Sequence, residues 1–177
     1  SVGALVPNKG FDLVIRSLGL IEASQRPALT IISNAVNPPE YAYLAELARG
    51  LDVAVDFRVG ISDDALVEAY NRALLTVYAP VMEPFGFVPL ESMACGTPVI
   101  GVNEAGVRET VQHEETGVLV ERDPAAFARA MISLLADRPH LARLGQHGRN
   151  VVLARWGWDR AVQTIEEHLI EAARGAL

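Results

Sequence analysis

Two carboxylates, Glu83 and Glu91, flank a short aromatic and glycine segment that reads Glu-Pro-Phe-Gly-Phe-Val-Pro-Leu-Glu. If the chain is helical from about Phe85, the two acids lie about 12 Å apart along the helix axis, at about 1.5 Å per residue. Paired carboxylates that act on one glycosidic bond lie closer together, at about 5 to 9.5 Å. The spacing therefore favours binding of the two ends of one long polar ligand over acid–base chemistry at a single bond.

The same segment has features of an anion or sugar site. A helix that begins near Phe85 offers free backbone amides and a partial positive charge at its N-terminus. Gly86 has no Cβ, so a ligand can approach the backbone closely. We therefore expect Glu83 to accept hydrogen bonds from hydroxyl groups at the mouth of this turn, and Glu91 to reach another part of the ligand.

The elements that must position these residues alternate between strands and helices. Six apolar segments are predicted to be strands, at residues 2–6, 29–33, 53–59, 74–79, 98–102 and 117–120. Helices are predicted between them at residues 11–23, 39–49, 63–72, 85–95 and 105–112. The strands are rich in Val, Ile and Leu with little alternation, which is typical of parallel strands covered on both faces. This order predicts an α/β fold, a doubly wound, mainly parallel, six-stranded Rossmann-like sheet with helices on both faces.

A helical extension is predicted to follow the last strand. Asp123 and Pro124 are typical of an N-cap and a first helical residue, and apolar residues then recur at helical spacing. Residues from about 140 to 176 are also predicted to be helical, with a break near Trp156 and Trp158. These tryptophans could bind a partner surface, but we expect them to pack the final helix onto the domain.

Composition excludes several classes of protein. The chain has 177 residues, about one domain, and its net charge of −7 without a Lys and Arg cluster argues against a nucleic-acid surface. The single cysteine, Cys95, cannot form an internal disulfide or a cysteine zinc site, and we expect it to be buried. No apolar run is long enough to cross a bilayer and no leader opens the chain, so a cytoplasmic setting is the default. The first residue is not Met and a strand is already under way, which indicates a piece of a longer polypeptide.

Ligands of a doubly wound sheet bind beyond the carboxyl ends of its strands. Three loops qualify here, at residues 7–10, 60–62 and 80–84. Lys9, in the first loop, could place a point charge on a phosphate, although a lysine considered alone is more often simply exposed. The P-loop, G-x-G-x-x-G, G-x-S-x-G and H-E-x-x-H motifs are absent and the four histidines are scattered, so these hydrolase, metalloprotease and nucleotide-binding classes lose their usual support.

Ordered blocks across nearly the whole chain resemble family 4 of the retaining, nucleotide-sugar-dependent glycosyltransferases (glycosyl transferase group 1), specifically their C-terminal, donor-binding half. The blocks are residues 2–10, 69–73, 83–91, 92–99, 104–109, 116–120 and 123–124. Any one block is a weak signal, whereas the set in this order is highly specific. The resemblance implies a protein with two Rossmann-like domains facing a cleft, of which residues 1–177 are the second and the acceptor-binding N-terminal domain is absent.

The resemblance also implies roles for single residues. Glu83 would contact hydroxyl groups of the transferred sugar, Glu91 would accept hydrogen bonds from the ribose, and Lys9 would neutralise the diphosphate leaving group. The other implied contacts are the base near Val59 and Ile61, and the sugar or diphosphate around Phe85, Gly86, Phe87 and Val88. Transfer would occur without a cofactor or bound metal, with departure and attack on one face of the sugar.

One position departs from the family. Ala4 stands where an arginine usually pairs with the lysine on the diphosphate, and the loss of that cation should remove about 1.5 to 3 kcal/mol of charged hydrogen bonding. Arg108 is a candidate substitute, although an exposed surface arginine is the commoner case.

Three interpretations stay open. The first is an active transferase that uses a UDP- or GDP-sugar and a hydroxyl acceptor bound by the missing half, in which case the isolated domain should bind donor weakly and have little or no activity. The second is an inactive glycosyltransferase-like binding or assembly module. The third is a nucleotide-sugar epimerase or sugar phosphorylase of the same architecture. A lipid-linked acceptor, with peripheral membrane association of the longer protein, is also open.

Overall fold

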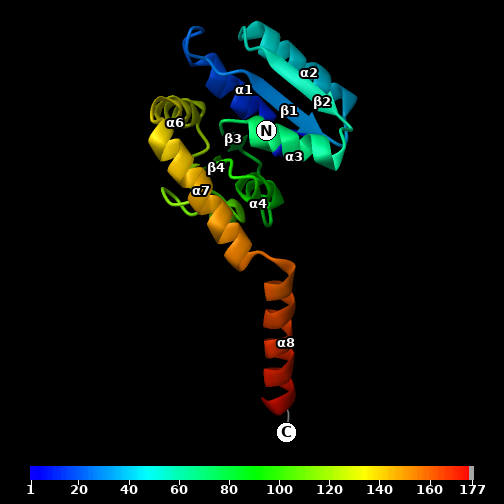
Figure 1. The fold of residues 1–177 in the computed structure, drawn as a ribbon. Coiled ribbons are helices and arrows are strands. Elements are labelled where there is room, and N and C mark those ends of the chain that lie inside the picture. The colour runs from blue at the N-terminus through cyan, green and yellow to red at the C-terminus, as the bar shows by residue number, and fades with distance from the viewer. Residues whose placement is uncertain (176–177) are drawn as a thin grey trace.

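Five strands form two parallel sheets in the computed structural model, which describes residues 1–175 (Figure 1). β1 (Leu29–Ser33) pairs with β2 (Val55–Val59), with Leu29 opposite Val55. The second sheet has the order β3 (Thr76–Tyr78), β4 (Val99–Val102) and β5 (Gly117–Val120). The predicted α/β fold with parallel strands and alternating helices is confirmed, but a single six-stranded sheet is not.

Residues 2–6 lie along β1 without forming the predicted strand. The Gly3 N–H donates to the Ile32 carbonyl at 3.0 Å, and the Leu5 N–H donates to the Ala35 carbonyl at 2.8 Å. The chain turns at Leu5, because the Val6 N–H bonds back to the Ala4 carbonyl at 2.8 Å. The segment therefore makes two isolated parallel bridges, to Ile32 in β1 and to Val36 beyond it, instead of a ladder.

The helices follow the strands in the predicted order. Their bounds are η1 Pro7–Lys9 (a 3-10 turn), α1 Phe11–Gly19, α2 Pro38–Gly50, α3 Asp63–Arg72, α4 Phe87–Ala94, α5 Val107–Thr110, α6 Pro124–Ala136, α7 Arg138–Arg155 and α8 Trp158–Gly175. The predicted cap at Asp123 is confirmed, since its side chain accepts from the Ala126 N–H at 3.0 Å. The predicted start of α4 at Phe85 is wrong, because Gly86 takes a left-handed φ of 99° and the helix begins only after it. The helical estimate of the distance from Glu83 to Glu91 therefore does not apply.

The core lies between the sheets and the helices packed on them. α1 packs against α2 and α6, and α4 packs against α7. Every residue of β3 and β4 is buried, as predicted for strands covered on both faces. β2 differs, because it is the outer strand of its sheet and most of its residues are exposed. The largest fully buried side chains include Phe11, Ile15, Ile31, Met93, Ile100, Phe127 and Met131.

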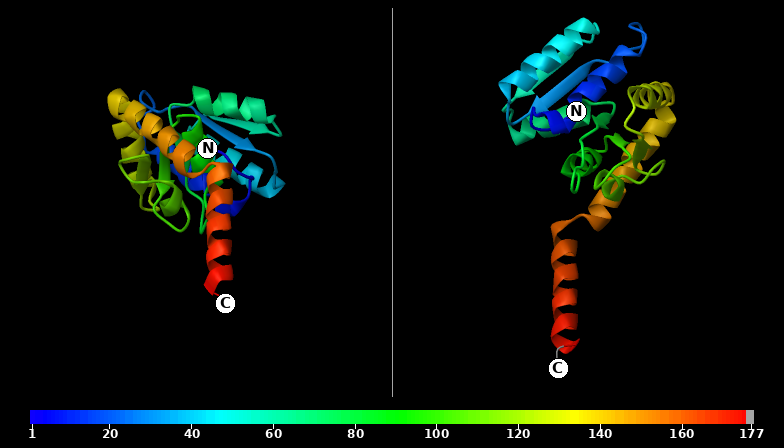
Figure 2. Two further views of the ribbon diagram at one scale, coloured as in Figure 1. Left: turned by 60° about the horizontal axis from the view of Figure 1, so that its bottom comes forward. Right: turned by 180° about the vertical axis from the view of Figure 1, so that it is seen from behind.

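α8 projects away from the rest of the molecule (Figures 1 and 2). Trp158 is 83% exposed, so the prediction that it packs the final helix onto the domain is wrong. Trp156 does contact the domain, since its ring lies 5.4 Å from that of Phe85, centroid to centroid. The chain turns between the two tryptophans, after α7 ends at Arg155, and α8 therefore leaves the body. Within residues 1–175, no helix combines the length and the apolar character needed to cross a membrane.

Candidate functional site

The loops at the carboxyl ends of the strands come together around η1. The Val81 N–H, in the loop after β3, donates to the Asn8 carbonyl in η1 at 2.7 Å. Gly10 closes this approach, because it has a left-handed φ of 66° and a Cβ there would lie 2.0 Å from the Ala79 carbonyl oxygen. Only glycine fits such a position without displacing the backbone. Two of the three loops predicted to face the ligand, residues 7–10 and 80–84, thus form one wall of the candidate site.

Lys9 and Glu83 form an ion pair on this wall. The Lys9 Nζ lies 2.8 Å from the Glu83 Oε2, and the side chains are 24% and 15% exposed. Partial burial by itself raises the pKa of Glu83, but hydrogen bonds from Lys9 and Tyr78 outweigh it and hold the pKa below the ordinary value. Glu83 is therefore a carboxylate at neutral pH. Two residues that lie far apart in the sequence, both predicted for the site, meet here.

The lowered pKa of Glu83 predicts a pH dependence of stability. A depressed carboxyl pKa contributes stability above the unfolded-state value, and this contribution is lost as pH falls through the folded-state value. We expect the wild-type chain to lose more free energy of unfolding than Glu83→Gln between about pH 6 and about pH 3. Urea denaturation at a series of pH values measures the free energy of unfolding of both proteins. An equal loss in the two proteins would contradict the lowered pKa of Glu83.

Glu40 gives a control of opposite sign. Burial and the charge of Asp12 raise its pKa, so protonation of Glu40 favours the folded state. Glu40→Gln should therefore make the loss of stability on acidification larger than in the wild type, whereas Glu83→Gln makes it smaller.

Two tyrosines that were not predicted for the site contact the carboxylates of Glu83 and Glu91. The Tyr70 hydroxyl donates to the Glu91 Oε2 at 3.0 Å. Tyr78 is buried beside Glu83, and its pKa is raised by burial, then by the charge of Glu83, and to a lesser extent by Glu91. Burial and then the charge of Glu91 raise the pKa of Tyr70 in the same way. Both hydroxyls therefore stay protonated, and each can donate to a carboxylate.

These tyrosines have a signal in the sequence. Tyr78 ends an apolar strand, and Tyr70 is the buried residue on the last turn of α3. A buried tyrosine hydroxyl requires a hydrogen-bond partner. The carboxylates near the carboxyl ends of neighbouring strands are the natural acceptors.

The N-terminus of α4 adjoins Glu83. Gly86 is its N-cap, no side-chain hydrogen bond caps this end, and the first turn carries no acidic residue. Phe87 is 67% exposed, while Phe85 and Val88 are half-buried. A helix end without a side-chain cap can bind an anion through its amides. The predicted backbone site around Phe85 to Val88 is therefore in a suitable conformation beside Glu83.

Val59 and Ile61 lie on the same edge of the fold, farther from Lys9. Val59 ends β2 and is 50% exposed, and Gly60 then takes a φ of 64°. β1 lies between β2 and residues 2–6, so two strand spacings, about 10 Å, separate the end of β2 from η1. The predicted residues are thus distributed along one edge, as a long ligand would require.

The remaining sequence candidates differ in their surroundings. Arg108 is exposed on α5, and its charge adds to the lowering of the pKa of Glu104, which comes mainly from a hydrogen bond with Arg122. Ala4 and Cys95 are half-buried, so the prediction that Cys95 is buried is only partly met. In the described part of the chain, no three His, Cys, Asp or Glu side chains gather as metal ligands would.

A cavity of about 430 Å³ lies at the opposite, amino ends of the strands. Residues of both sheets line it, including Leu29, Thr30, Leu75 and Thr76. None of the predicted site residues lines it. Tyr70, which donates to Glu91, also lines this cavity, so the cavity adjoins the Glu91 end of the site.

Gly106 brings the loop after β4 against the Glu83 segment. Its N–H donates to the Glu83 carbonyl at 2.9 Å, and a Cβ there would lie 2.4 Å from the Pro84 carbonyl oxygen. We expect Gly106→Ala to lower the free energy of unfolding by about 1 to 3 kcal/mol, because backbone must move to admit the methyl group. Gly50→Ala is the matched control, since nothing lies within 4 Å of that Cβ. Equal stability of the two variants in urea would contradict this close packing.

Comparison with known proteins identifies the family. Residues 1–151 match the family described as Glycosyl transferases group 1. The chain belongs to this family. The Lys9–Glu83 pair and Glu91 lie within the matched residues.

Sequence relatives in this family are longer than the chain. It is 32% identical over 183 residues to D-inositol 3-phosphate glycosyltransferase of Streptomyces bingchenggensis, covering 98% of the chain and 40% of that protein. It is 35% identical over 178 residues to a GDP-mannose-dependent alpha-(1-6)-phosphatidylinositol monomannoside mannosyltransferase of Mycobacterium tuberculosis, covering 93% and 45%. The chain thus spans less than half of the length of these curated relatives.

Solved structures share the fold. Sucrose-phosphate synthase from Thermosynechococcus elongatus superposes with a TM-score of 0.85 at 29% identity, covering 99% of the chain and 45% of that protein. HepE from Anabaena, solved in complex with UDP-glucose, superposes with a TM-score of 0.84 at 23% identity, covering 96% and 48%. The second likeness concerns the fold alone.

Proposed function

We propose that this chain is the C-terminal, donor-binding half of a retaining family 4 glycosyltransferase. The longer protein would move a sugar from a UDP- or GDP-sugar to a hydroxyl acceptor. The observation that carries the proposal is the Lys9–Glu83 ion pair at the carboxyl edge of the sheets, beside the uncapped N-terminus of α4. The printed names of relatives that use GDP-mannose or bind UDP-glucose support this class of donor.

Each part of the donor has a partner in this proposal. The diphosphate binds Lys9 and the first amides of α4, and the sugar hydroxyls bind Glu83. The ribose binds Glu91, which Tyr70 orients through its 3.0 Å hydrogen bond. The base lies against the backbone near Val59 and Ile61.

The proposed reaction exchanges one bond at the anomeric carbon. The bond from this carbon to the diphosphate oxygen breaks, and the acceptor oxygen bonds to the same face of the sugar while its proton passes to the departing phosphate. Negative charge develops on the diphosphate, where a fixed positive charge stabilises it. Lys9 supplies that charge, and the proposal requires no resident metal or cofactor.

Ala4 supports a second candidate, an inactive binding or assembly module. The structure places Ala4 three residues before η1, so an arginine there would be close to Lys9. Ala4→Arg separates the two candidates when the longer protein is assayed for sugar transfer. An inactive module stays inactive with the arginine, whereas an enzyme compensated by another cation is active without it.

The other half of the longer protein would bind the acceptor. Its chemistry determines the linkage, and a lipid-linked acceptor would associate the protein with a membrane surface. A cytoplasmic setting, where nucleotide sugars are made, fits the proposal.

Calorimetric titration of the chain with UDP, GDP and ADP tests the proposal. We expect one nucleotide to bind at millimolar concentration or below, and Glu91→Gln to weaken that binding about ten-fold, because it removes one charged hydrogen-bond acceptor. Glu46→Gln, on the exposed side of α2, is the control and should leave the affinity unchanged. If none of the three nucleotides binds, the proposed function is wrong.

A further inference from the structure

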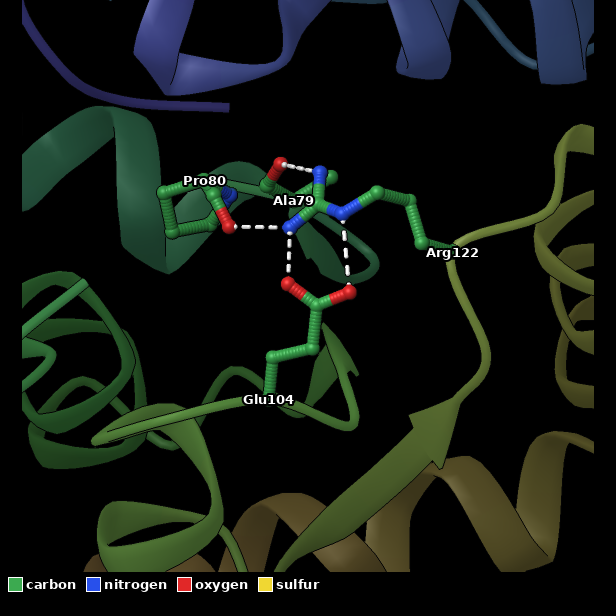
Figure 3. A network of polar contacts seen from close by, with 4 residues as sticks. All are labelled: Ala79, Pro80, Glu104 and Arg122. Carbon is green, nitrogen blue, oxygen red and sulfur yellow. Dashed lines mark hydrogen bonds and ion pairs between the residues drawn. The ribbon is translucent and has the colours of Figure 1, made fainter. Parts of the chain in front are cut away.

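Arg122 binds the chain just before the Glu83 turn (Figure 3). It lies two residues beyond β5, and its Nη1 donates to the Ala79 carbonyl at 3.0 Å while its Nη2 donates to the Pro80 carbonyl at 2.5 Å. β3 ends at Tyr78, so sheet pairing no longer satisfies these carbonyls. Both residues are buried, and Arg122 supplies the donors that buried backbone oxygens require.

Glu104 fixes the plane of the Arg122 guanidinium. The Nε donates to the Glu104 Oε1 at 2.8 Å, and the Nη2 donates to the Oε2 at 2.6 Å. This is a bidentate pair, which is geometrically more restrictive than a single contact. The hydrogen bond from Arg122 lowers the pKa of Glu104, so the carboxylate stays charged. We call Arg122 and Glu104 the loop clamp.

The loop clamp acts on Glu83 from both sides. Upstream, Arg122 holds Pro80, three residues before Glu83. Downstream, Glu104 begins the turn in which the Gly106 N–H donates to the Glu83 carbonyl at 2.9 Å. Between these anchors, Met82 takes a φ of 50°, which is unfavourable for a residue with a side chain and is maintained only by its surroundings.

Arg122 is not the missing cation of the diphosphate site. Its four hydrogen bonds leave one of the five guanidinium N–H groups free, and Glu104 neutralises its charge. A guanidinium so committed holds protein atoms, not a ligand. Its effect on a donor must pass through the loop that it binds.

We infer that Arg122 and Glu104 are positioning residues that hold Glu83 in the position where it contacts the transferred sugar. This inference rests on the proposed function. Lys9 bonds to Glu83 and Glu91 bonds to Tyr70, and neither bonds directly to Arg122 or Glu104. Loss of the clamp should therefore impair recognition of the sugar more than recognition of the nucleotide.

The test compares two ligands on each variant. Dissociation constants for a nucleoside diphosphate and for the corresponding nucleotide sugar are measured by calorimetry on wild type, Glu104→Gln and Arg122→Lys. Glu104→Gln keeps the size of the side chain and removes its charge, while Arg122→Lys keeps the charge and loses the second arm. Glu46→Gln is the matched control, because Glu46 also makes a bidentate pair, with Arg49, on an exposed helix away from the site.

We expect Glu104→Gln to weaken nucleotide-sugar binding about ten-fold and nucleoside diphosphate binding less than about two-fold. Arg122→Lys should give a smaller loss with the same selectivity, and Glu46→Gln should change neither constant. Equal losses of affinity for both ligands would show a merely structural role and overturn the inference. Unchanged affinity for the nucleotide sugar would also overturn it. If the wild type binds neither ligand, the proposed function itself fails, which is a separate result.

Discussion

Lys9→Met should weaken binding of a nucleoside diphosphate about 10- to 100-fold. The ammonium is the only lysine charge in the sequence, and it lies at the junction of η1 and the Glu83 loop. A charged hydrogen bond contributes about 1.5 to 3 kcal/mol, and about 1.4 kcal/mol corresponds to a factor of ten in affinity. The substitution also leaves the Glu83 carboxylate without its cation, so its negative charge opposes the diphosphate. Calorimetric titration of the purified chain measures the change.

Arg49→Met is the control for this prediction. Arg49 is also paired with a glutamate, but the pair is exposed on α2. Its removal changes the net charge by the same amount and should leave nucleotide affinity within about two-fold, since surface pairs are weak and screened. Equal effects of the two substitutions would mean that Lys9 acts only through the overall charge of the protein.

Glu83→Gln should lower sugar transfer by the longer protein about 100-fold, measured as kcat/KM. In the proposed site the carboxylate accepts hydrogen bonds from sugar hydroxyls, and each charged bond contributes about 1.5 to 3 kcal/mol. Binding of the nucleoside diphosphate should instead become tighter. Glu83 holds the Lys9 ammonium at 2.8 Å, so the neutral amide releases that charge to the diphosphate.

The two readouts of Glu83→Gln therefore separate a sugar contact from a structural role. Loss of both transfer and nucleotide binding would indicate that the variant damages the whole site. Retained transfer would contradict the assignment of Glu83 to the sugar. Glu46→Gln is again the control, because it removes a carboxylate from an exposed ion pair.

Much of the fold could be predicted because its local signals are strong. Asp123 and Pro124 marked the start of α6, and the apolar runs marked β1, β4 and β5 within a residue or two. Residues 2–6 were predicted as a strand from composition alone. Composition cannot show that the Val6 N–H bonds back to Ala4, which interrupts the pairing with β1.

The candidate site could be predicted only in part. Lys9 and Glu83 were both chosen, but their direct contact depends on the approach of η1 to β3 at Gly10, which is a tertiary feature. Tyr70 was missed because its hydroxyl bond to Glu91 joins two helices. Arg122 was missed because its partners are backbone carbonyls, which leave no trace in the identity of the residues.

The position of Lys9 at the diphosphate is the central claim, and NMR tests it most directly. Chain labelled with 13C at the lysine Cε gives one side-chain signal, because Lys9 is the only lysine. On titration with the nucleoside diphosphate that calorimetry selects, the account predicts that this signal shifts to saturation with the calorimetric dissociation constant. Binding measured by calorimetry while the Lys9 signal stays unchanged would contradict it.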